Sequence, residues 1–335
     1  MYLKGDNFMS YIIGIDHGNG NMKTENSIYP CGYKMQETAP DKLFARDIIE
    51  YDGKYYTLST TRFSYQTDKT ADEKAFIFTL FSMAKELIAR AAAGKADYDV
   101  QKDFDGFVGK EVILAVGLPP AHFEKQAKPF KEYFLNRNKH GINFKYNGKS
   151  FSFYLKDVLV YPQDYAAAVV FKGDLLSQYS TCYCIDIGDG TIDMVGLTNG
   201  MPDKDTMLSR EYGMSKLRST IIDSIINDYG VTLNHNTVED FLSGKKIALA
   251  PDIEEQISSR IKKTADDFAR DIVNQLHSKV SDFRVFPVIF CGGGAIALKQ
   301  YLEKTKAFSI THYITEINAN AVGYQQIAKM SLGIE

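Results

Sequence analysis

Two short turns, rich in glycine and acidic residues, carry the clearest chemical signal in this 335-residue chain. Asp16-His-Gly18-Asn-Gly20 and Asp186-Ile-Gly188-Asp-Gly190 share the pattern Asp-x-Gly-x-Gly, and each follows an apolar run typical of a buried strand. Glycine lets such a turn bring its backbone N–H groups close to anionic oxygens, because no Cβ stands in the way. The Asp at the end of the strand adds a carboxylate. The pattern therefore predicts a site that handles phosphate and Mg²⁺.

The repetition of this pattern in both halves of the chain indicates an internal duplication. Mg²⁺ keeps several water ligands in proteins, so Asp16 and Asp186 can hold the hydrated ion while phosphate oxygens complete its coordination. We expect phosphate contacts from Gly18, Asn19, Gly20, Asn21 and Lys23 in the first turn, and from Gly188, Asp189, Gly190 and Thr191 in the second. Lys23 would neutralise phosphate charge as a point cation. Two glycine-rich hairpins with a purely structural role are the alternative.

The elements that must position these turns alternate between strands and helices. Residues 11–15 and 182–186 are predicted as strands that lead into the turns, and 285–290 as a buried strand. A long helix is predicted over 70–93, where Thr70 and Glu73 have the spacing of a capping box. Hairpins near the start of each half, followed by helices, favour an α/β fold of two related domains, each with a mixed sheet.

Composition narrows the class of protein. Lys plus Arg number 39 and Asp plus Glu 42, for a net charge of −3, so direct binding to DNA is not expected. No apolar run reaches the length of about 18 to 20 residues that crosses a bilayer, and residues 1–10 lack the apolar core of a signal peptide. The four cysteines form no Cys-x-x-Cys pair. These features predict a cytoplasmic protein that does not use the membrane.

Three segments resemble the nucleotide motifs of actin-fold ATPases. Residues 15–23 are similar to the first phosphate motif of that family, 186–193 to the second, and Gly292-Gly293-Gly294 with its preceding strand to the adenosine motif. The motifs occur in the family's order, and the resemblance spans residues 11 to about 330. The segments 117–120 and 318–324 further resemble bacterial plasmid-segregation members, the ParM/StbA-like group. The resemblance implies an actin-like fold with domain I at 1–162 and 306–335 and domain II at 163–305.

The resemblance also implies a role for Gln163. In the family, a Gln or Glu just before a helix of small residues orients the attacking water, and Gln163 occupies that place before the alanine run 166–168. A Gln side chain is uncharged at pH 7, so its contribution would be positioning. Asp164 is the competing candidate, and a simple helix-entry role stays open for both. His17 is expected to be a turn residue, and Lys245-Lys246 either approach the nucleotide or form a solvated helix end.

Together these motifs imply a Mg²⁺-dependent ATPase that binds ATP or ADP and uses Gln163, Asp16 and Asp186 in hydrolysis. The resemblance implies head-to-tail self-assembly into cytoskeletal filaments. It also implies plasmid DNA segregation through an adaptor protein that binds a centromere-like site. The alternative is a small-molecule, sugar-type kinase of the same superfold, in which Asp164 would accept the proton of a substrate hydroxyl.

Overall fold

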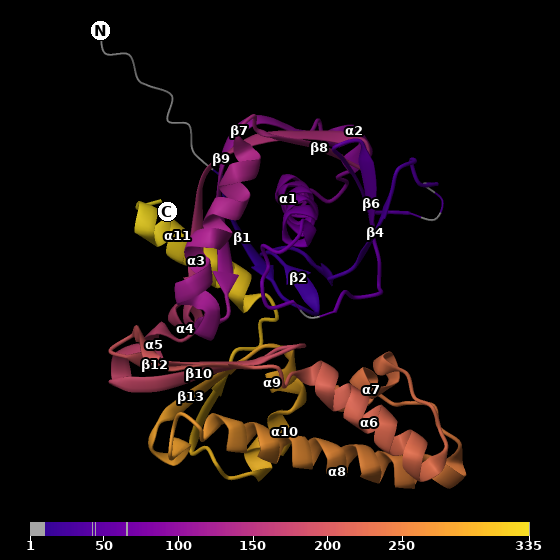
Figure 1. Ribbon diagram of the computed structural model, residues 1–335, viewed down its shortest axis with the longest axis vertical. Coiled ribbons are helices and arrows are strands. Elements are labelled where there is room, and N and C mark those ends of the chain that lie inside the picture. The colour runs from indigo at the N-terminus through magenta and orange to yellow at the C-terminus, as the bar shows by residue number, and fades with distance from the viewer. Residues whose placement is uncertain (1–10, 42, 44, 65, 335) are drawn as a thin grey trace. The chain divides into compact units, whose positions relative to one another are not determined.

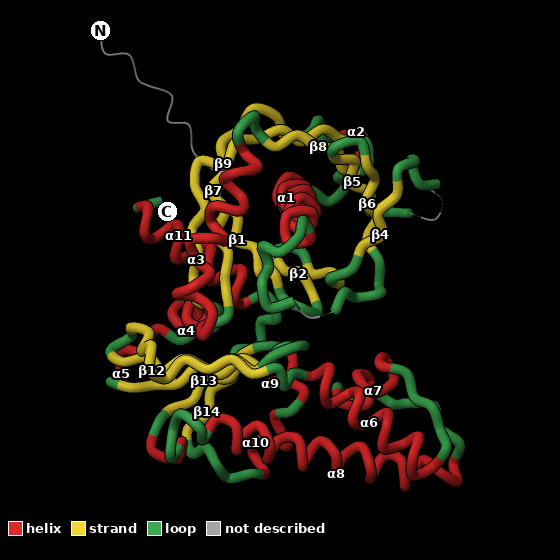
Figure 2. The backbone as a smooth tube through the Cα atoms, viewed as in Figure 1, coloured by secondary structure: helices red, strands yellow, loops and turns green. Residues whose placement is uncertain are grey.

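A computed structural model describes residues 11–41, 43, 45–64 and 66–334 of the chain. These residues divide into two compact units, each with its own sheet and helices (Figures 1 and 2). The first unit holds the described residues up to Leu118, His122–Ala166 and those from Asn320, and the second holds Pro119–Ala121 and Ala167–Ala319. The predicted α/β class with two mixed sheets is confirmed. The expectation about residues 1–10 lies outside the described residues.

The first unit is built on a nine-stranded mixed sheet with the order β3-β2-β1-β7-β9-β8-β5-β6-β4. Its strands are β1 (Tyr11–His17), β2 (Asn21–Lys23), β3 (Ile28–Pro30), β4 (Tyr33–Gln36), β5 (Ile48–Tyr51), β6 (Lys54–Leu58), β7 (Phe107–Leu118), β8 (Ile142–Tyr146) and β9 (Lys149–Pro162). β1 runs parallel to β7 and antiparallel to β2. The first glycine turn is therefore the connection between β1 and β2.

Helices cover both faces of this sheet near β1. On one face, α1 (Lys74–Ala92) and α3 (Pro120–Leu135) share a core with Ile13 and Ile15, and Figure 1 shows α1 lying within the curve of the sheet. On the other face, α4 (Tyr165–Phe171) and α11 (Ala319–Leu332) pack against Ile12. Burial on both faces explains why β1 reads as a continuous apolar run. The short helices α2 (Val100–Asp103) and η1 (Asn136–Asn138) complete the unit.

The second unit has a five-stranded sheet with the order β12-β11-β10-β13-β14. The strands are β10 (Thr181–Ile187), β11 (Ile192–Thr198), β12 (Met201–Arg210), β13 (Pro287–Cys291) and β14 (Ile310–Tyr313). The helical segments are α5 (Gly173–Gln178), α6 (Met214–Tyr229), α7 (His235–Leu242), α8 (Pro251–Leu276), η2 (Phe283–Val285), α9 (Gly293–Ala297) and α10 (Lys299–Lys304). One face of β10 packs against α6 and α8 through Ile185 and Ile187.

Local details differ from the sequence prediction at the start of α1. This helix begins at Lys74, and Glu73 precedes it without a side-chain cap. Thr70 instead closes a local turn, because its N–H and its hydroxyl both donate to Asp68 Oδ1 at 2.8 and 2.7 Å. The predicted helix start at Thr70 is therefore wrong. Among the described residues, none of the helices combines the length and apolar character needed to span a membrane.

Candidate functional site

The first turn joins its acid and its cation directly. Asp16 and Lys23 are paired in register across β1 and β2, and Lys23 Nζ lies 3.2 Å from Asp16 Oδ2. The Asp16 side chain is only 3% exposed, so a charge partner offsets part of the cost of burying its carboxylate. From the residue that follows β3, Cys31 Sγ donates to the carbonyl of Gly18 at 2.8 Å and Cys31 N donates to the carbonyl of Gly20 at 3.1 Å. The turn is thus held from both ends.

Gln163 reaches the same carboxylate from a different strand. β9 ends at Pro162, and the N–H of Gln163 donates to the carbonyl of Leu118 at the end of β7. The Gln163 Nε2 donates to Asp16 Oδ1 at 3.3 Å, opposite the oxygen that Lys23 contacts. The first unit therefore brings Asp16, Lys23 and Gln163 together.

Asp164 follows Gln163 in a left-handed backbone conformation, with φ of 67°. Its N–H donates to Asn320 Oδ1 of α11 at 2.9 Å, and the residue is fully buried. A positive φ is uncommon for Asp, so tertiary contacts must hold this residue in place. Gln163 thus contacts the first turn through its side-chain amide, while the helix-entry role stays open for Asp164.

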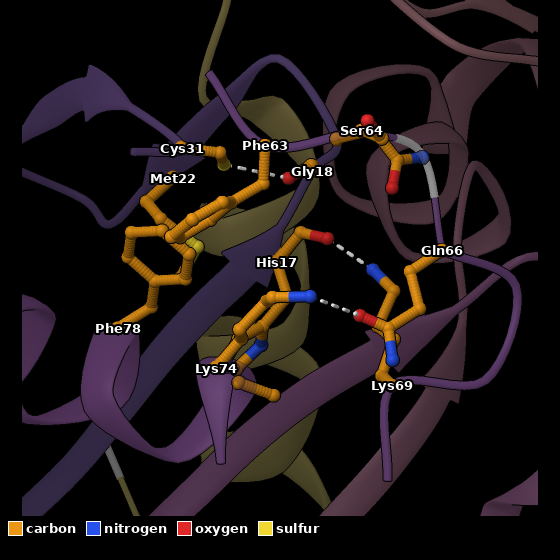
Figure 3. Close-up of a pocket in the computed structure, with 12 residues that line it drawn as sticks. His17, Gly18, Met22, Cys31, Phe63, Ser64, Gln66, Lys69, Lys74 and Phe78 are labelled. Carbon is orange, nitrogen blue, oxygen red and sulfur yellow. Dashed lines mark hydrogen bonds between the residues drawn. The ribbon is translucent and has the colours of Figure 1, made fainter. Parts of the chain in front are cut away.

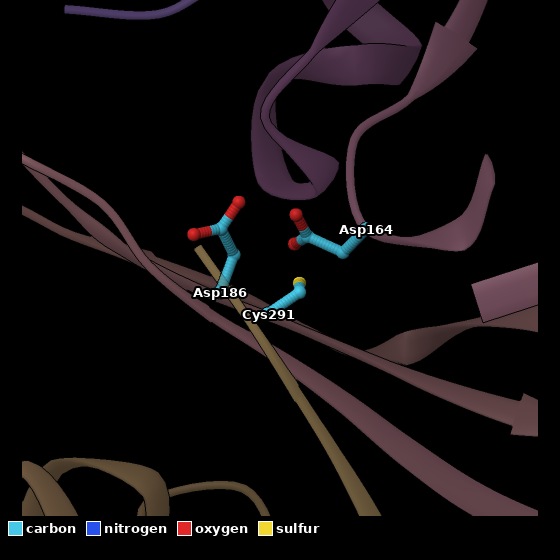
Figure 4. Close-up of side chains that lie close together, drawn as sticks. All are labelled: Asp164, Asp186 and Cys291. Atoms are coloured by element: carbon cyan, nitrogen blue, oxygen red, sulfur yellow. The ribbon is translucent and has the colours of Figure 1, made fainter. Parts of the chain in front are cut away.

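The second turn joins β10 to β11. Asp186 is paired in register with Asp193 of β11 on one side and with Cys291 of β13 on the other; Figure 4 shows Asp186 and Cys291 next to each other on these strands. The turn closes through the N–H of Gly188, which donates to the carbonyl of Thr191 at 2.9 Å. The Thr191 hydroxyl donates to Asp193 Oδ2 at 2.8 Å, so it serves the turn itself.

The carbonyl groups of the second turn face the start of α6. The pairs are Gly213 N with Gly190 O at 3.1 Å, Met214 N with Gly188 O at 3.0 Å, and Ser215 N with Asp189 O at 2.8 Å. In a planar trans peptide the N–H points away from the C=O of the same unit. The N–H groups of Asp189, Gly190 and Thr191 therefore point away from α6. Successive N–H groups with this orientation form a concave site suited to an anion.

The glycine triplet lies next to this turn. Gly292 follows β13 with φ of 83°, and a Cβ at this position would lie 2.0 Å from Asp186 Oδ1. At Gly294 a Cβ would lie 2.6 Å from the carbonyl of Ile187, whereas Gly293, the first residue of α9, faces open space. Two of the three glycines are thus required by close packing against the residues of the second turn.

The two turns occupy equivalent places in their units. Each Asp lies near the end of its strand and pairs with a residue of the antiparallel strand that follows the turn. The partner is Lys23 in the first unit and Asp193 in the second, and the number of residues between Asp and partner is the same in both. The predicted duplication is therefore visible in the strand register. The equivalent positions carry opposite charges, which makes the two turns chemically different.

His17 has a different role from the one predicted. It is the last residue of β1 and is 4% exposed, its Nε2 lies 2.8 Å from Thr79 Oγ1 of α1, and its ring packs against Phe130 and Phe134 of α3. Burial, reinforced by the positive charge of Lys69, lowers the pKa of His17 to about 3. A neutral, packed imidazole anchors the turn to the core, so the expectation of a turn residue is wrong.

Behind the first turn lies a pocket that sequence reasoning missed (Figure 3). Its wall combines the apolar Met22, Phe63 and Phe78 with the cations Lys69 and Lys74. The Lys69 ammonium donates to the carbonyl of His17, as the dashed line in Figure 3 shows. Lys69 thereby supports the turn from the segment before α1. Nothing in the local sequence signals this contact, because it joins residues that are far apart in the chain.

Lys245 lies beyond the end of α7. Its side chain is 70% exposed, and its Nζ is 2.8 Å from Asp240 Oδ1. This geometry agrees with the solvated helix end, the alternative in which Lys245 has no part in the site.

Comparisons with known proteins identify the fold. A family model of the N-terminal domain of actin-like proteins matches residues 14–165, and a model of the C-terminal part of archaeal MreB-like actin homologues matches residues 184–304. No curated protein matches the chain by sequence. The chain therefore has the actin-like fold, and the predicted resemblance to actin-like ATPases is confirmed by these matches.

Solved structures of similar fold align with nearly the whole chain. An archaeal actin homologue, Ta0583, is 19% identical with a TM-score of 0.73, and the alignment covers 96% of this chain and 99% of that one. A 15-stranded ParM filament from Clostridium botulinum has 19% identity, a TM-score of 0.70 and the same coverage. An AlfA filament bound to AMPPNP has 16% identity and a TM-score of 0.59, covering 97% and 98%. At these identities the likeness establishes the fold, and ParM proteins are among the proteins that share it.

Proposed function

We propose that this chain is a polymerising, actin-like ATPase. The observation that carries the proposal is the pair of equivalent turns. In each turn an Asp lies near the end of a strand and pairs, in the same register, with a residue of the strand that follows the turn. We propose that both turns bind the phosphates of one ATP or ADP, and that Asp16 and Asp186 hold its Mg²⁺ through water.

The residues present fit such a ligand. The N–H groups of the second turn point away from α6 and can donate to phosphate oxygens. Carboxylates are the ligands that a hydrated Mg²⁺ prefers. Gly292 and Gly294 pack against the second turn, whereas Gly293 faces open space, so its backbone is accessible to an adenosine. When bound, Mg²⁺ neutralises phosphate charge during phosphoryl transfer.

Hydrolysis then depends on how the chain positions water. Gln163 is 8% exposed, and its amide is oriented by the Nε2 contact to Asp16. An uncharged amide can hold a water molecule in line for attack by accepting and donating hydrogen bonds. Lys23 contributes a fixed positive charge beside Asp16. Asp164 is the second candidate, and the kinase alternative would use it as the proton acceptor.

Relatives of the same fold support the polymer. The similar structures include a ParM filament, an Alp12 filament and an AlfA filament bound to AMPPNP, and Ta0583 is known in complex with ADP. We propose that this chain likewise forms filaments in the cytoplasm and moves plasmid DNA. The net charge of −3 gives the chain no general attraction for DNA, so an adaptor protein would bind the centromere-like site.

The decisive experiment is electron microscopy and light scattering of the purified protein with ATP and Mg²⁺, alongside phosphate release. We expect filaments with ATP and Mg²⁺, none without nucleotide, and release of phosphate in the absence of any acceptor. Absence of polymer together with phosphate transfer to a sugar would replace this proposal with the kinase. EDTA and a non-hydrolysable ATP analogue are the controls, because they separate binding from hydrolysis.

A further inference from the structure

The second turn concentrates acid where the proposed function requires an anion to bind. Asp186, Asp189 and Asp193 all belong to this turn or its flanking strands. Like charges a few ångströms apart repel strongly when water is partly excluded. Each carboxylate must therefore be neutralised or turned away if phosphate is to enter.

The structure gives two of these carboxylates partners within the second unit. Asp193 accepts hydrogen bonds from the hydroxyl groups of Thr191 and Ser209. Asp189 has a charged partner, because Arg218 Nη2 of α6 lies 2.5 Å from its Oδ1. The Arg218 side chain is 6% exposed, and its Nη1 lies 3.1 Å from Glu239 Oε1 of α7. One buried guanidinium thus joins the turn, α6 and α7.

The position of Arg218 follows from the contact between the turn and α6. The helix starts against the turn carbonyls, and a Cβ at Gly213 would lie 2.4 Å from the carbonyl oxygen of Asp189. Arg218 lies further along α6, on a buried position of the helix, and its side chain reaches the Asp189 carboxylate. The carboxylate is therefore engaged by α6, the same element that the turn carbonyls face.

We propose that Arg218 is the positioning residue of the second phosphate turn. It compensates the charge of Asp189 and holds that carboxylate toward α6, so that the N–H groups of the turn remain available to phosphate. This inference rests on the proposed function. It predicts that replacing Arg218 weakens ligand binding more strongly the more negative charge the ligand carries. It also predicts that removing the charge of Asp189 restores the lost affinity.

The test compares binding of ATP, ADP and adenosine, by calorimetry, to the wild type, Arg218→Met, Asp189→Asn and the double variant. We expect Arg218→Met to weaken ATP binding by about 10- to 100-fold, ADP less and adenosine about 3-fold at most. We expect the double variant to recover at least about 10-fold of the ATP affinity. An equal loss for adenosine, or no recovery in the double variant, would show a merely structural role and overturn the inference.

Two further arms keep the test decisive. Asp189→Asn alone removes one negative charge and leaves Arg218 in place, so we expect it to tighten ATP binding by about 2- to 5-fold. A loss of more than about 10-fold would make Asp189 a direct ligand and overturn the inference even if Arg218→Met does not fold. A wild type that binds no nucleotide would overturn the proposed function and this inference together, whereas binding by the wild type without recovery in the double variant overturns this inference alone.

Discussion

Gln163 and Asp16 lie 147 residues apart in the sequence, and the side-chain amide of Gln163 donates to Asp16 Oδ1 at 3.3 Å. The contact is possible because β1, β7 and β9 are parallel neighbours, so their carboxyl ends meet at the same edge of the sheet. Lys23 holds the other oxygen of the same carboxylate. Asp16 is therefore a shared anchor for a cation and for a neutral amide.

This contact makes Gln163→Ala informative. We expect hydrolysis of ATP to slow by about 10- to 100-fold, because water loses its positioning group, while the affinity for ATP changes little. Single-turnover phosphate release and nucleotide titration measure the two quantities separately. Asp164→Asn is the matched comparison: a larger loss of hydrolysis there than in Gln163→Ala would transfer the role to Asp164.

Asp186→Ala tests the second turn. We expect this variant to lose hydrolysis altogether, since Asp186 is one of the two carboxylates that we propose hold the Mg²⁺. Titration of Mg²⁺ at saturating ATP would show whether high metal concentration restores any rate. If Asp186→Ala and Gln163→Ala lose ATP affinity equally, the positioning role of Gln163 is refuted.

The glycine triplet offers a matched pair of variants. Gly292→Ala places a Cβ 2.0 Å from Asp186 Oδ1 at a residue with φ of 83°, whereas Gly293→Ala points into open space. We expect Gly292→Ala to destabilise the second unit by about 2 kcal/mol or more and to weaken nucleotide binding. Gly293→Ala should keep the melting temperature of the wild type. Similar melting curves for both variants would contradict the packing described here.

Buried His17 predicts acid sensitivity. Burial lowers its pKa to about 3 in the folded protein, against 6.5 for a histidine side chain exposed to water, so the unfolded chain binds more protons between these values. Stability is then complete above pH 6.5 and falls as the pH drops toward 3. From pH 7 to pH 5 the wild type should lose about 2 kcal/mol more than His17→Leu, as measured by urea unfolding. Equal losses would show that His17 titrates normally.

Much of the site was predictable because its signals are local. The two turns, the strands before them and the glycine triplet are each contained in a few consecutive residues, and the structure places them as strand ends and tight turns. The edge strand β12 was not predicted, since its exposed positions carry polar residues and Pro202, which obscure the alternation of a strand.

The parts of the site that the sequence did not predict depend on contacts between residues far apart in the chain. Arg218 is an ordinary helical residue in the sequence, and only the folded unit shows that it meets Asp189 and Glu239. Lys69 likewise gives no local sign of its bond to the carbonyl of His17. Tertiary contacts of this kind decide the electrostatics of a site, and one sequence does not reveal which residues they join.

The return of α11 to the first unit sets an order for biogenesis. The N–H of Gly14 in β1 donates to Gln325 Oε1 of α11 at 3.2 Å, and a Cβ at Gly14 would lie 2.0 Å from the carbonyl of Ala321. As a ribosome releases the chain, Ala167–Ala319 emerge before the rest of this helix does. The second unit therefore has all of its residues while the first still exposes the apolar face that Tyr324 and Ala328 cover. A nascent chain would acquire its first glycine turn in finished form only after α11 has emerged and packed against β1.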